Sequence, residues 1–173
     1  MFGLAARRCQ NTVVAMMDLA EAKRILAALG REGVDYVLVG SVAMAAQGLV
    51  RATRDLDLFV APAPSNVERL KKALKSLYAD DASVDEISVD DLAGQYPAIR
   101  YAPPQGDYYI DILSRLGEAF RYEEIEREEV TLDGVCVQVA TPRMLFRMKK
   151  DTVRPQDRLD AEALRQAFGL EEK

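Results

Sequence analysis

Apolar and polar residues alternate along the chain in patterns that predict its first elements. Apolar residues recur every three or four positions between Leu19 and Leu29, and Asp18 before them is a residue type that caps helix N-termini. This predicts the first helix. The run Tyr36–Val39 is short and β-rich, which predicts a strand buried on both faces. A helix of small residues, capped by Ser41, is expected to follow over 42–47.

Strict alternation marks the second strand, over 54–60. Asp55 and Asp57 lie on one of its faces, and the leucines that follow each of them lie on the other. A helix is predicted from the capping-box sequence at Ser65 as far as Leu77. The acid-rich segment 80–91 is expected to be a solvated loop.

The rest of the chain predicts four more strands and two helices. Asp133-Gly134 is a two-residue hairpin signal, and Thr141-Pro142 is typical of a helix start. The pattern predicts an α+β fold, with a mixed β-sheet of about five strands flanked by helices and a C-terminal helical segment. The expected strands cover 98–102, 108–113, 128–132 and 135–139, the helices cover 141–150 and 155–169, and the expected division is a loose extension (1–17), a core domain (18–140) and a C-terminal helical segment packed on the core (141–173).

The amino-acid composition excludes several classes of protein and of catalytic site. The chain has 173 residues, 49% hydrophobic and 29% charged, which fits one globular domain. Histidine is absent, so Ser-His-Asp triads, His-ligated zinc and imidazole bases are excluded. The formal net charge of −5 argues against a bulk binder of nucleic acid, and no apolar stretch approaches the ~18 residues that span a bilayer. Two cysteines without a CxxC pair favour a reduced, cytoplasmic setting.

One combination of residues points to a reaction: Gly40-Ser41 where a strand ends, Asp55 and Asp57 in the next strand, and Asp111 in a later one. A glycine that leaves a buried strand lets a phosphate approach the backbone, and Ser41 adds a hydroxyl donor. Asp55 and Asp57 project from the same face, so they repel unless a divalent cation lies between them. Three carboxylates on adjacent strands suit metal ions that assist an in-line phosphoryl displacement.

Each of these features also has a purely structural explanation. Gly40-Ser41 can be a turn followed by a helix cap, and the Asp-x-Asp pair can be the wet face of an antiparallel sheet. Asp111 can be a charge that protects a sheet edge. A plain α+β domain needs all three explanations at once, so the ordered combination favours a functional site.

The same residues resemble the signature of the polymerase β-like nucleotidyltransferase superfamily. The matching string is Val39-Gly40-Ser41, a thirteen-residue spacer and Asp55-Leu56-Asp57-Leu58, with Asp111 as the later acid. Gly48, Arg51 and Thr53 around it resemble the variant seen in small bacterial nucleotidyltransferases of the toxin and phage-defence kind. Lys149 and the segment Arg154–Asp160 are similar to the C-terminal helix of that group.

The resemblance implies transfer of a nucleoside monophosphate from an NTP, such as ATP, to a hydroxyl acceptor, with release of pyrophosphate. It implies Mg²⁺ or Mn²⁺ as the cofactor. It also implies that Asp111 helps to deprotonate the acceptor hydroxyl. It assigns nucleotide binding to Gly40, Ser41, Arg54 and Lys149. It assigns catalysis and metal binding to Asp55, Asp57 and Asp111.

Several alternatives stay open. The acceptor is tRNA, a protein or a small molecule, and a protein partner is compatible with the resemblance, whereas a membrane partner is not expected. A catalytically silent nucleotidyltransferase-fold binding or regulatory protein, such as a toxin–antitoxin component, is the second reading of the function. Asp157 and Asp160 either belong to the site or face the positive end of a helix dipole. Tyr108 and Tyr109 are candidates to stack on a base, although alternation places one of them in the core.

Overall fold

The computed structural model describes residues 17–171. The expected extension over 1–17 therefore lies outside the described residues, apart from Met17. Along the chain the elements are α1 (Leu19–Arg31), β1 (Tyr36–Val39), α2 (Gly40–Ala46), β2 (Asp55–Val60), α3 (Pro64–Leu77), α4 (Ser83–Glu86), α5 (Val89–Ala93), β3 (Ala98–Tyr101), β4 (Tyr109–Leu113), β5 (Arg115–Leu116), β6 (Phe120–Arg121), the 3₁₀ helix η1 (Tyr122–Glu124), β7 (Arg127–Leu132), β8 (Val135–Ala140), α6 (Pro142–Lys149) and α7 (Pro155–Phe168).

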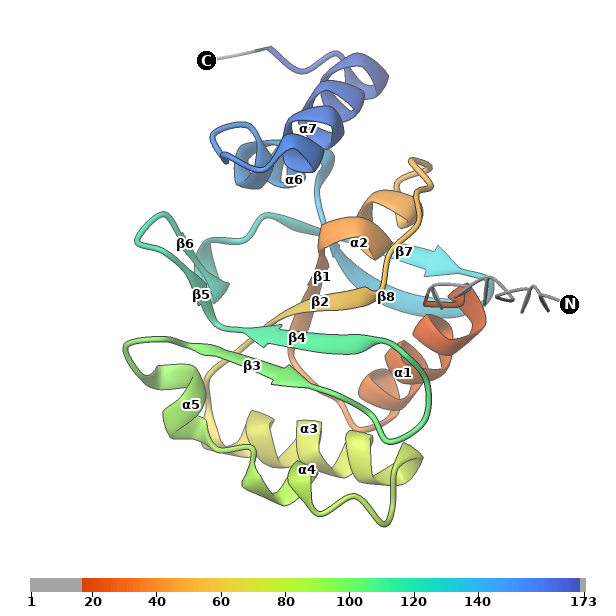
Figure 1. Cartoon of the computed structure of the whole chain (residues 1–173), viewed down its shortest axis with the longest axis vertical. Helices are drawn as coiled ribbons and strands as arrows, with labels where there is room; N and C mark the ends of the chain where they lie inside the picture. Colours follow the sequence, from red (N-terminus) through yellow and green to blue (C-terminus); the bar gives the residue numbers. More distant parts are fainter. Residues whose placement is uncertain (1–16, 172–173) are drawn as a thin grey trace, which may run out of the picture.

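Six of the strands form one mixed sheet in the order β3-β4-β2-β1-β8-β7 (Figure 1). The pairs β2/β4 and β1/β8 are parallel, and the other three pairs are antiparallel. Strands β5 and β6 form a separate antiparallel pair. The prediction of an α+β fold with a mixed sheet, flanking helices and a C-terminal helical segment is confirmed.

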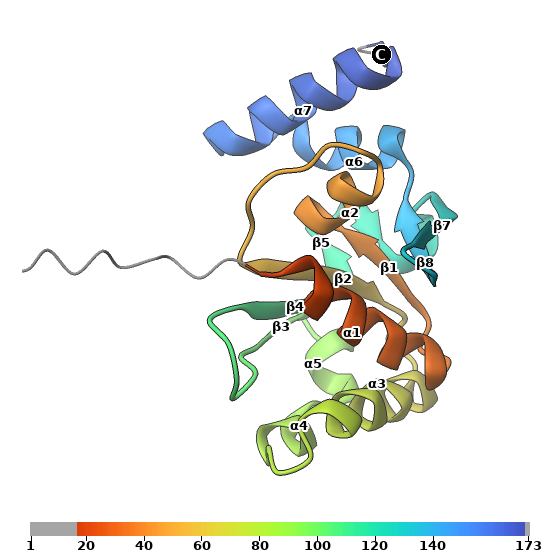
Figure 2. The ribbon, with the colours of Figure 1, turned by 90° about the vertical axis from the view of Figure 1, so that its right-hand side faces the viewer.

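The two faces of the sheet differ in chemistry. Leu56 and Leu58 of β2 are paired with Ile110 and Ile112 of β4, and all four side chains are fully buried. The intervening positions of the same strands carry the acids. Helices α1 and α3 lie on one side of the sheet, and α2, α6 and α7 lie on the other (Figure 2). The apolar face meets α1 and α3, so the acidic face is turned toward α2 and α6.

Local sequence explains several element boundaries. The Asp18 side chain accepts a hydrogen bond from the backbone N–H of Ala20 and caps α1, as predicted. Thr141 likewise caps α6 by accepting from the N–H of Met144. At the β7–β8 turn, Asp133 and Gly134 have φ angles of 44° and 87°, the left-handed values that a tight two-residue hairpin requires.

Two local predictions for residues 64–91 are wrong. Helix α3 begins at Pro64 without a side-chain cap, so the predicted capping box at Ser65 does not form. Its third residue, Asn66, is buried and instead bonds the backbone of Asp35 and Ala61, which joins the start of β1 to the end of β2. The acidic segment 80–91 is not a plain loop, because the buried Val84 and Leu92 hold the short helices α4 and α5 against the core.

The C-terminal helices α6 and α7 pack against each other and against the domain. Phe146 of α6 and Leu164 of α7 belong to the same buried apolar cluster as the sheet residues. This packing brings the C-terminal end of α6 and the first turn of α7 over the acidic face. Within residues 17–171, none of the helices is both long enough and apolar enough to cross a membrane.

Candidate active site

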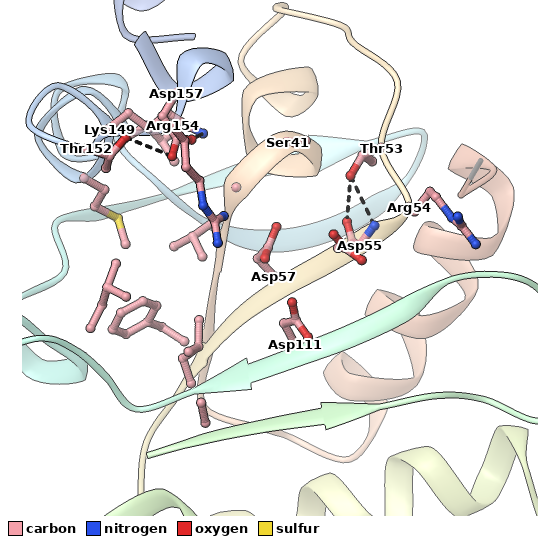
Figure 3. Close-up of a pocket in the computed structure, with 18 of the residues that line it drawn as sticks. Ser41, Thr53, Arg54, Asp55, Asp57, Asp111, Lys149, Thr152, Arg154 and Asp157 are labelled. Carbon is pink, nitrogen blue, oxygen red and sulfur yellow. Dashed lines mark hydrogen bonds and ion pairs between the residues drawn. The ribbon is translucent and has the colours of Figure 1, made fainter. Parts of the chain in front are cut away.

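Neighbouring strands place the predicted acids on one face of the sheet. Asp57 of β2 is directly paired with Asp111 of β4, and Asp111 is in turn paired with Arg100 of β3. Asp55 is paired with Tyr109, one step along the same face. Paired residues of adjacent strands point to the same side of a sheet, so the three carboxylates share the face toward α2 (Figure 3).

Gly40 lies directly against Asp57. Strand β1 ends at Val39, the partner of Asp57, and Gly40 begins α2 with a φ of 66°. A Cβ atom placed on Gly40 would lie 2.0 Å from Oδ2 of Asp57. Both the left-handed backbone and the lack of space therefore require glycine. The space beside the glycine is filled by the Asp57 carboxylate, whereas the sequence suggested that it was left for a phosphate.

Ser41 is a residue of the first turn of α2. The helix begins two residues earlier than predicted, with Val39 as its N-cap and no side-chain cap, so the prediction that Ser41 caps it is wrong. The positive φ of Gly40 turns the chain from strand into helix without an intervening cap residue. Ser41 is only 4% exposed, and it contributes to the lining of the cleft described below.

The ionisation of Asp57 reflects this crowding. Burial is the main reason why the pKa of Asp57 rises to about 6, and repulsion from Asp111 and Asp55 adds to it. Lys149 and Arg51 oppose the rise. A carboxylate that is costly to ionise among other carboxylates is a position where a bound cation stabilises the folded protein.

Arg100 binds the third acid through both of its oxygens. Its Nε donates to Oδ1 of Asp111 over 2.8 Å, and its Nη2 donates to Oδ2 over 2.7 Å. The guanidinium also lies over the ring of Tyr109, 4.9 Å from the ring centroid. Sequence reasoning missed Arg100, since only the register of β3 against β4 brings it opposite Asp111.

The donor set suits a divalent cation in kind, because Mg²⁺ and Mn²⁺ prefer carboxylate oxygens. Within residues 17–171, however, no group of three acidic or cysteine side chains is arranged so that it could hold a metal ion. At Asp111, both oxygens of the carboxylate accept hydrogen bonds from Arg100.

Lys149 sits in a buried network of opposite charges. Its Nζ donates to Oδ1 of Asp157 and to Oδ2 of Asp160, both over 2.8 Å. Asp160 is 3% exposed and also pairs with Nε of Arg51 at 3.1 Å. The network joins α6, α7 and the loop before β2 above the acidic face. Asp157 lines the cleft described below and also lies in the first turn of α7, so both interpretations of this acid stay predictions.

The two tyrosines beside Asp111 have different surroundings. The hydroxyl of Tyr108 lies 2.7 Å from that of Tyr78 and also donates to Glu21, and Tyr108 is buried. Tyr109 is partly exposed, and the guanidinium of Arg100 lies over its ring. As strand alternation predicted, one of the pair belongs to the core.

The three acids, the start of α2 and Lys149 line one cleft of about 1160 Å³. All seven residues that the sequence resemblance assigned line it, together with the apolar residues Phe59, Leu113, Leu116, Met148 and Val153. Figure 3 shows Asp57 and Asp111 facing each other, with Lys149 and Asp157 above them and Arg54 at one side. The seven assigned residues that line the cleft are Gly40, Ser41, Arg54, Asp55, Asp57, Asp111 and Lys149, and their roles stay predictions.

Comparison with solved structures identifies the architecture. A nucleotidyltransferase-like antigenic protein from Paracoccidioides brasiliensis superposes with a TM-score of 0.54 and 15% identity over 88% of this chain and 79% of its own. The fold is that of the nucleotidyltransferases. The nucleotidyltransferase ANT(2")-Ia, solved in complex with adenylyl-2"-tobramycin, superposes with a TM-score of 0.53 and 14% identity over 87% of this chain and 88% of its own. No protein-family model and no curated protein matches the sequence.

Proposed function

We propose that this protein is a metal-dependent nucleotidyltransferase that moves a nucleoside monophosphate from an NTP to a hydroxyl acceptor and releases pyrophosphate. The proposal depends above all on the pairing of Asp57 with Asp111 on adjacent strands, with Asp55 on the same face of a cleft in a nucleotidyltransferase fold. The raised pKa of Asp57 supports it, because like charges are gathered where a cation would relieve them.

In this proposal, Asp55, Asp57 and Asp111 hold Mg²⁺ or Mn²⁺. The ion, when bound, supplies positive charge that neutralises the triphosphate and makes pyrophosphate a better leaving group. Gly40 and Ser41 contact the β- and γ-phosphates from the first turn of α2.

Two cations complete the proposed nucleotide site. Arg54, an exposed residue at one side of the cleft, and Lys149, above Asp57, offset the remaining negative charge of the triphosphate. Lys149 acts while it stays bonded to Asp157 and Asp160, so its part is that of a fixed positive charge.

The chemical step is a direct displacement at the α-phosphorus. The acceptor hydroxyl oxygen forms a bond to that phosphorus, and the bond to the bridging oxygen of the pyrophosphate breaks. Asp111 accepts the proton of the hydroxyl, and pyrophosphate carries away the electron pair of the broken bond. The residues that position the triphosphate therefore control the in-line geometry.

We propose ATP as the first donor to test, because the ligand of ANT(2")-Ia is an adenylylated small molecule. The acceptor classes are a small-molecule hydroxyl, a tRNA end and a protein hydroxyl, including one of this chain. A cytoplasmic setting goes with this chemistry and with the two cysteines that lack a CxxC pair.

The test is pyrophosphate release from each of the four NTPs with Mg²⁺ or Mn²⁺, followed together with transfer of an α-³²P label to protein or RNA. We expect metal-dependent release by the wild type and none by Asp57→Ala. Asp80→Ala removes an exposed acid outside the cleft and serves as the matched control. Equal activity of Asp57→Ala and wild type would overturn the proposal.

A further inference from the structure

We propose that Arg100 occupies the carboxylate of Asp111 when no nucleotide is bound, and that a divalent metal binds by replacing it. The inference rests on the proposed function, in which Asp111 is a metal ligand. It adds a resident counter-cation that competes with the metal and so makes metal binding depend on the substrate.

The geometry of the pair makes the competition direct. The two nitrogens of Arg100 contact different oxygens of Asp111, at 2.8 and 2.7 Å, so the carboxylate has no oxygen without a bonded partner. A fork of this kind satisfies a carboxylate more completely than a single ammonium contact does. A divalent cation that takes Asp111 as a ligand comes close to this guanidinium, so the two positive charges repel each other and compete for the same carboxylate.

Arg100 is also placed so that it can leave. It lies on β3, the strand at one edge of the sheet, and its side chain is 58% exposed, whereas that of Asp111 is 20% exposed. A guanidinium with this much access to water loses little solvation in the pair and regains it on release. The ring of Tyr109 beneath it keeps the released group close to the cleft.

The contrast with Lys149 supports this reading. Lys149 is 8% exposed and is held by two carboxylates from α7, so it is a fixed cation of the site. Among residues 17–171, Arg100 has one carboxylate partner, and its side chain is largely exposed. The nucleotide brings further oxygen ligands to the metal, which tips the competition away from Arg100.

The test is Mn²⁺ binding to the full-length protein without nucleotide, measured by the EPR signal of free Mn²⁺. We expect Arg100→Gln to bind Mn²⁺ about three- to tenfold more tightly than the wild type, the range that loss of a partly exposed ion pair supports. Arg100→Lys, which keeps the charge but not the fork, should lie between them. Arg121→Gln removes an exposed arginine of β6 that does not line the cleft, and it should leave the affinity unchanged.

A repeat with a non-hydrolysable ATP analogue separates this proposal from the proposed function. If the wild type binds Mn²⁺ together with the analogue, while Arg100→Gln binds Mn²⁺ alone no more tightly than wild type, Arg100 orients Asp111 and does not compete, and this inference is overturned. If no variant binds Mn²⁺ with or without the analogue, the metal site itself is wrong and both proposals fall.

Discussion

The missing side chain of Gly40 leaves the space that the carboxylate of Asp57 occupies. A Cβ on Gly40 would lie 2.0 Å from Oδ2 of Asp57, far inside van der Waals contact, although Gly40 belongs to the helix after β1 and Asp57 belongs to β2. The pairing of Val39 with Asp57 creates this contact, because the residue after Val39 turns across the face from which Asp57 projects. The glycine and the acid therefore form one unit of the site.

This relationship predicts that Gly40→Ala displaces Asp57 and abolishes nucleotidyl transfer. Gly33→Ala is the matched control, since Gly33 has nearly the same φ, +63° against +66°, with open space around it. Both variants carry the strain of a left-handed alanine, about 1 kcal/mol, and Gly40→Ala adds the clash. Urea unfolding should show Gly40→Ala to be less stable than Gly33→Ala by at least about 1 kcal/mol. Equal stabilities together with normal activity would show that the contact is unimportant.

Asp57→Asn is predicted to stabilise the protein at neutral pH while it removes activity. The pKa of Asp57 is about 6 in the folded protein against an ordinary 3.8. Between about pH 4 and pH 6, the folded state therefore holds a proton that the unfolded chain has already released. Stability therefore falls as the pH rises from about 4 to about 6, by roughly 2–3 kcal/mol in all. The asparagine avoids this loss.

We expect urea unfolding at pH 4 to show little difference between Asp57→Asn and wild type. At pH 8, in the absence of metal, the variant should be more stable by about 1–3 kcal/mol. Asp80→Asn, at an exposed acid, should show no such divergence with pH. A variant that is less stable than wild type at pH 8 would contradict the charge crowding inferred at Asp57.

Lys149→Met is predicted to destabilise the protein strongly. The substitution leaves Asp157 and the buried Asp160 without the cation that they share, and a broken buried pair costs about 3–5 kcal/mol. Lys72→Met breaks an exposed pair with Glu32 and should cost about 1 kcal/mol or less. Thermal unfolding of both variants measures the contrast, and similar losses would mean that the Lys149 network is no more than a surface ion pair.

Arg54→Ala is predicted to weaken nucleotide binding without affecting the fold. Arg54 is exposed, and its Nε donates a long hydrogen bond, 3.4 Å, to the carbonyl of Asp107. Loss of a charged contact to phosphate should raise the Kd for Mg²⁺-ATP about tenfold, with a change in unfolding free energy of ~0.5 kcal/mol or less. Calorimetric titration checks the Kd, with Arg121→Ala as the control, and an unchanged Kd would remove Arg54 from the site.

Periodicity was enough to predict which strands carry the acids. The alternation in β2 places Asp55 and Asp57 on one face, and the apolar neighbours of Asp111 place it on the polar face of β4. The periods of strands and helices are local properties, so a short stretch of sequence is enough to detect them. The hairpin at Asp133-Gly134 was predictable for the same reason.

Long-range pairing could not be predicted in this way. The ion pair of Arg100 with Asp111 depends on the register of β3 against β4, and that of Arg51 with Asp160 depends on how α7 packs above the loop before β2. Neither leaves a local signal. The predicted Ser41 and Ser65 caps failed because a positive φ at Gly40 and the tertiary hydrogen bonds of Asn66 outweigh capping preference.

Metal-dependent binding of a nucleotide tests the central claim most directly, because it requires no knowledge of the acceptor. Calorimetric titration of the wild type with an ATP analogue that cannot be cleaved at the α-phosphorus should show binding with Mg²⁺ that weakens at least tenfold in EDTA, about 1.4 kcal/mol. Asp57→Asn should bind as weakly with Mg²⁺ as the wild type does in EDTA. Equal affinity of the wild type with and without Mg²⁺, or of Asp57→Asn and wild type with Mg²⁺, would contradict a metal-dependent nucleotidyltransferase site at these carboxylates.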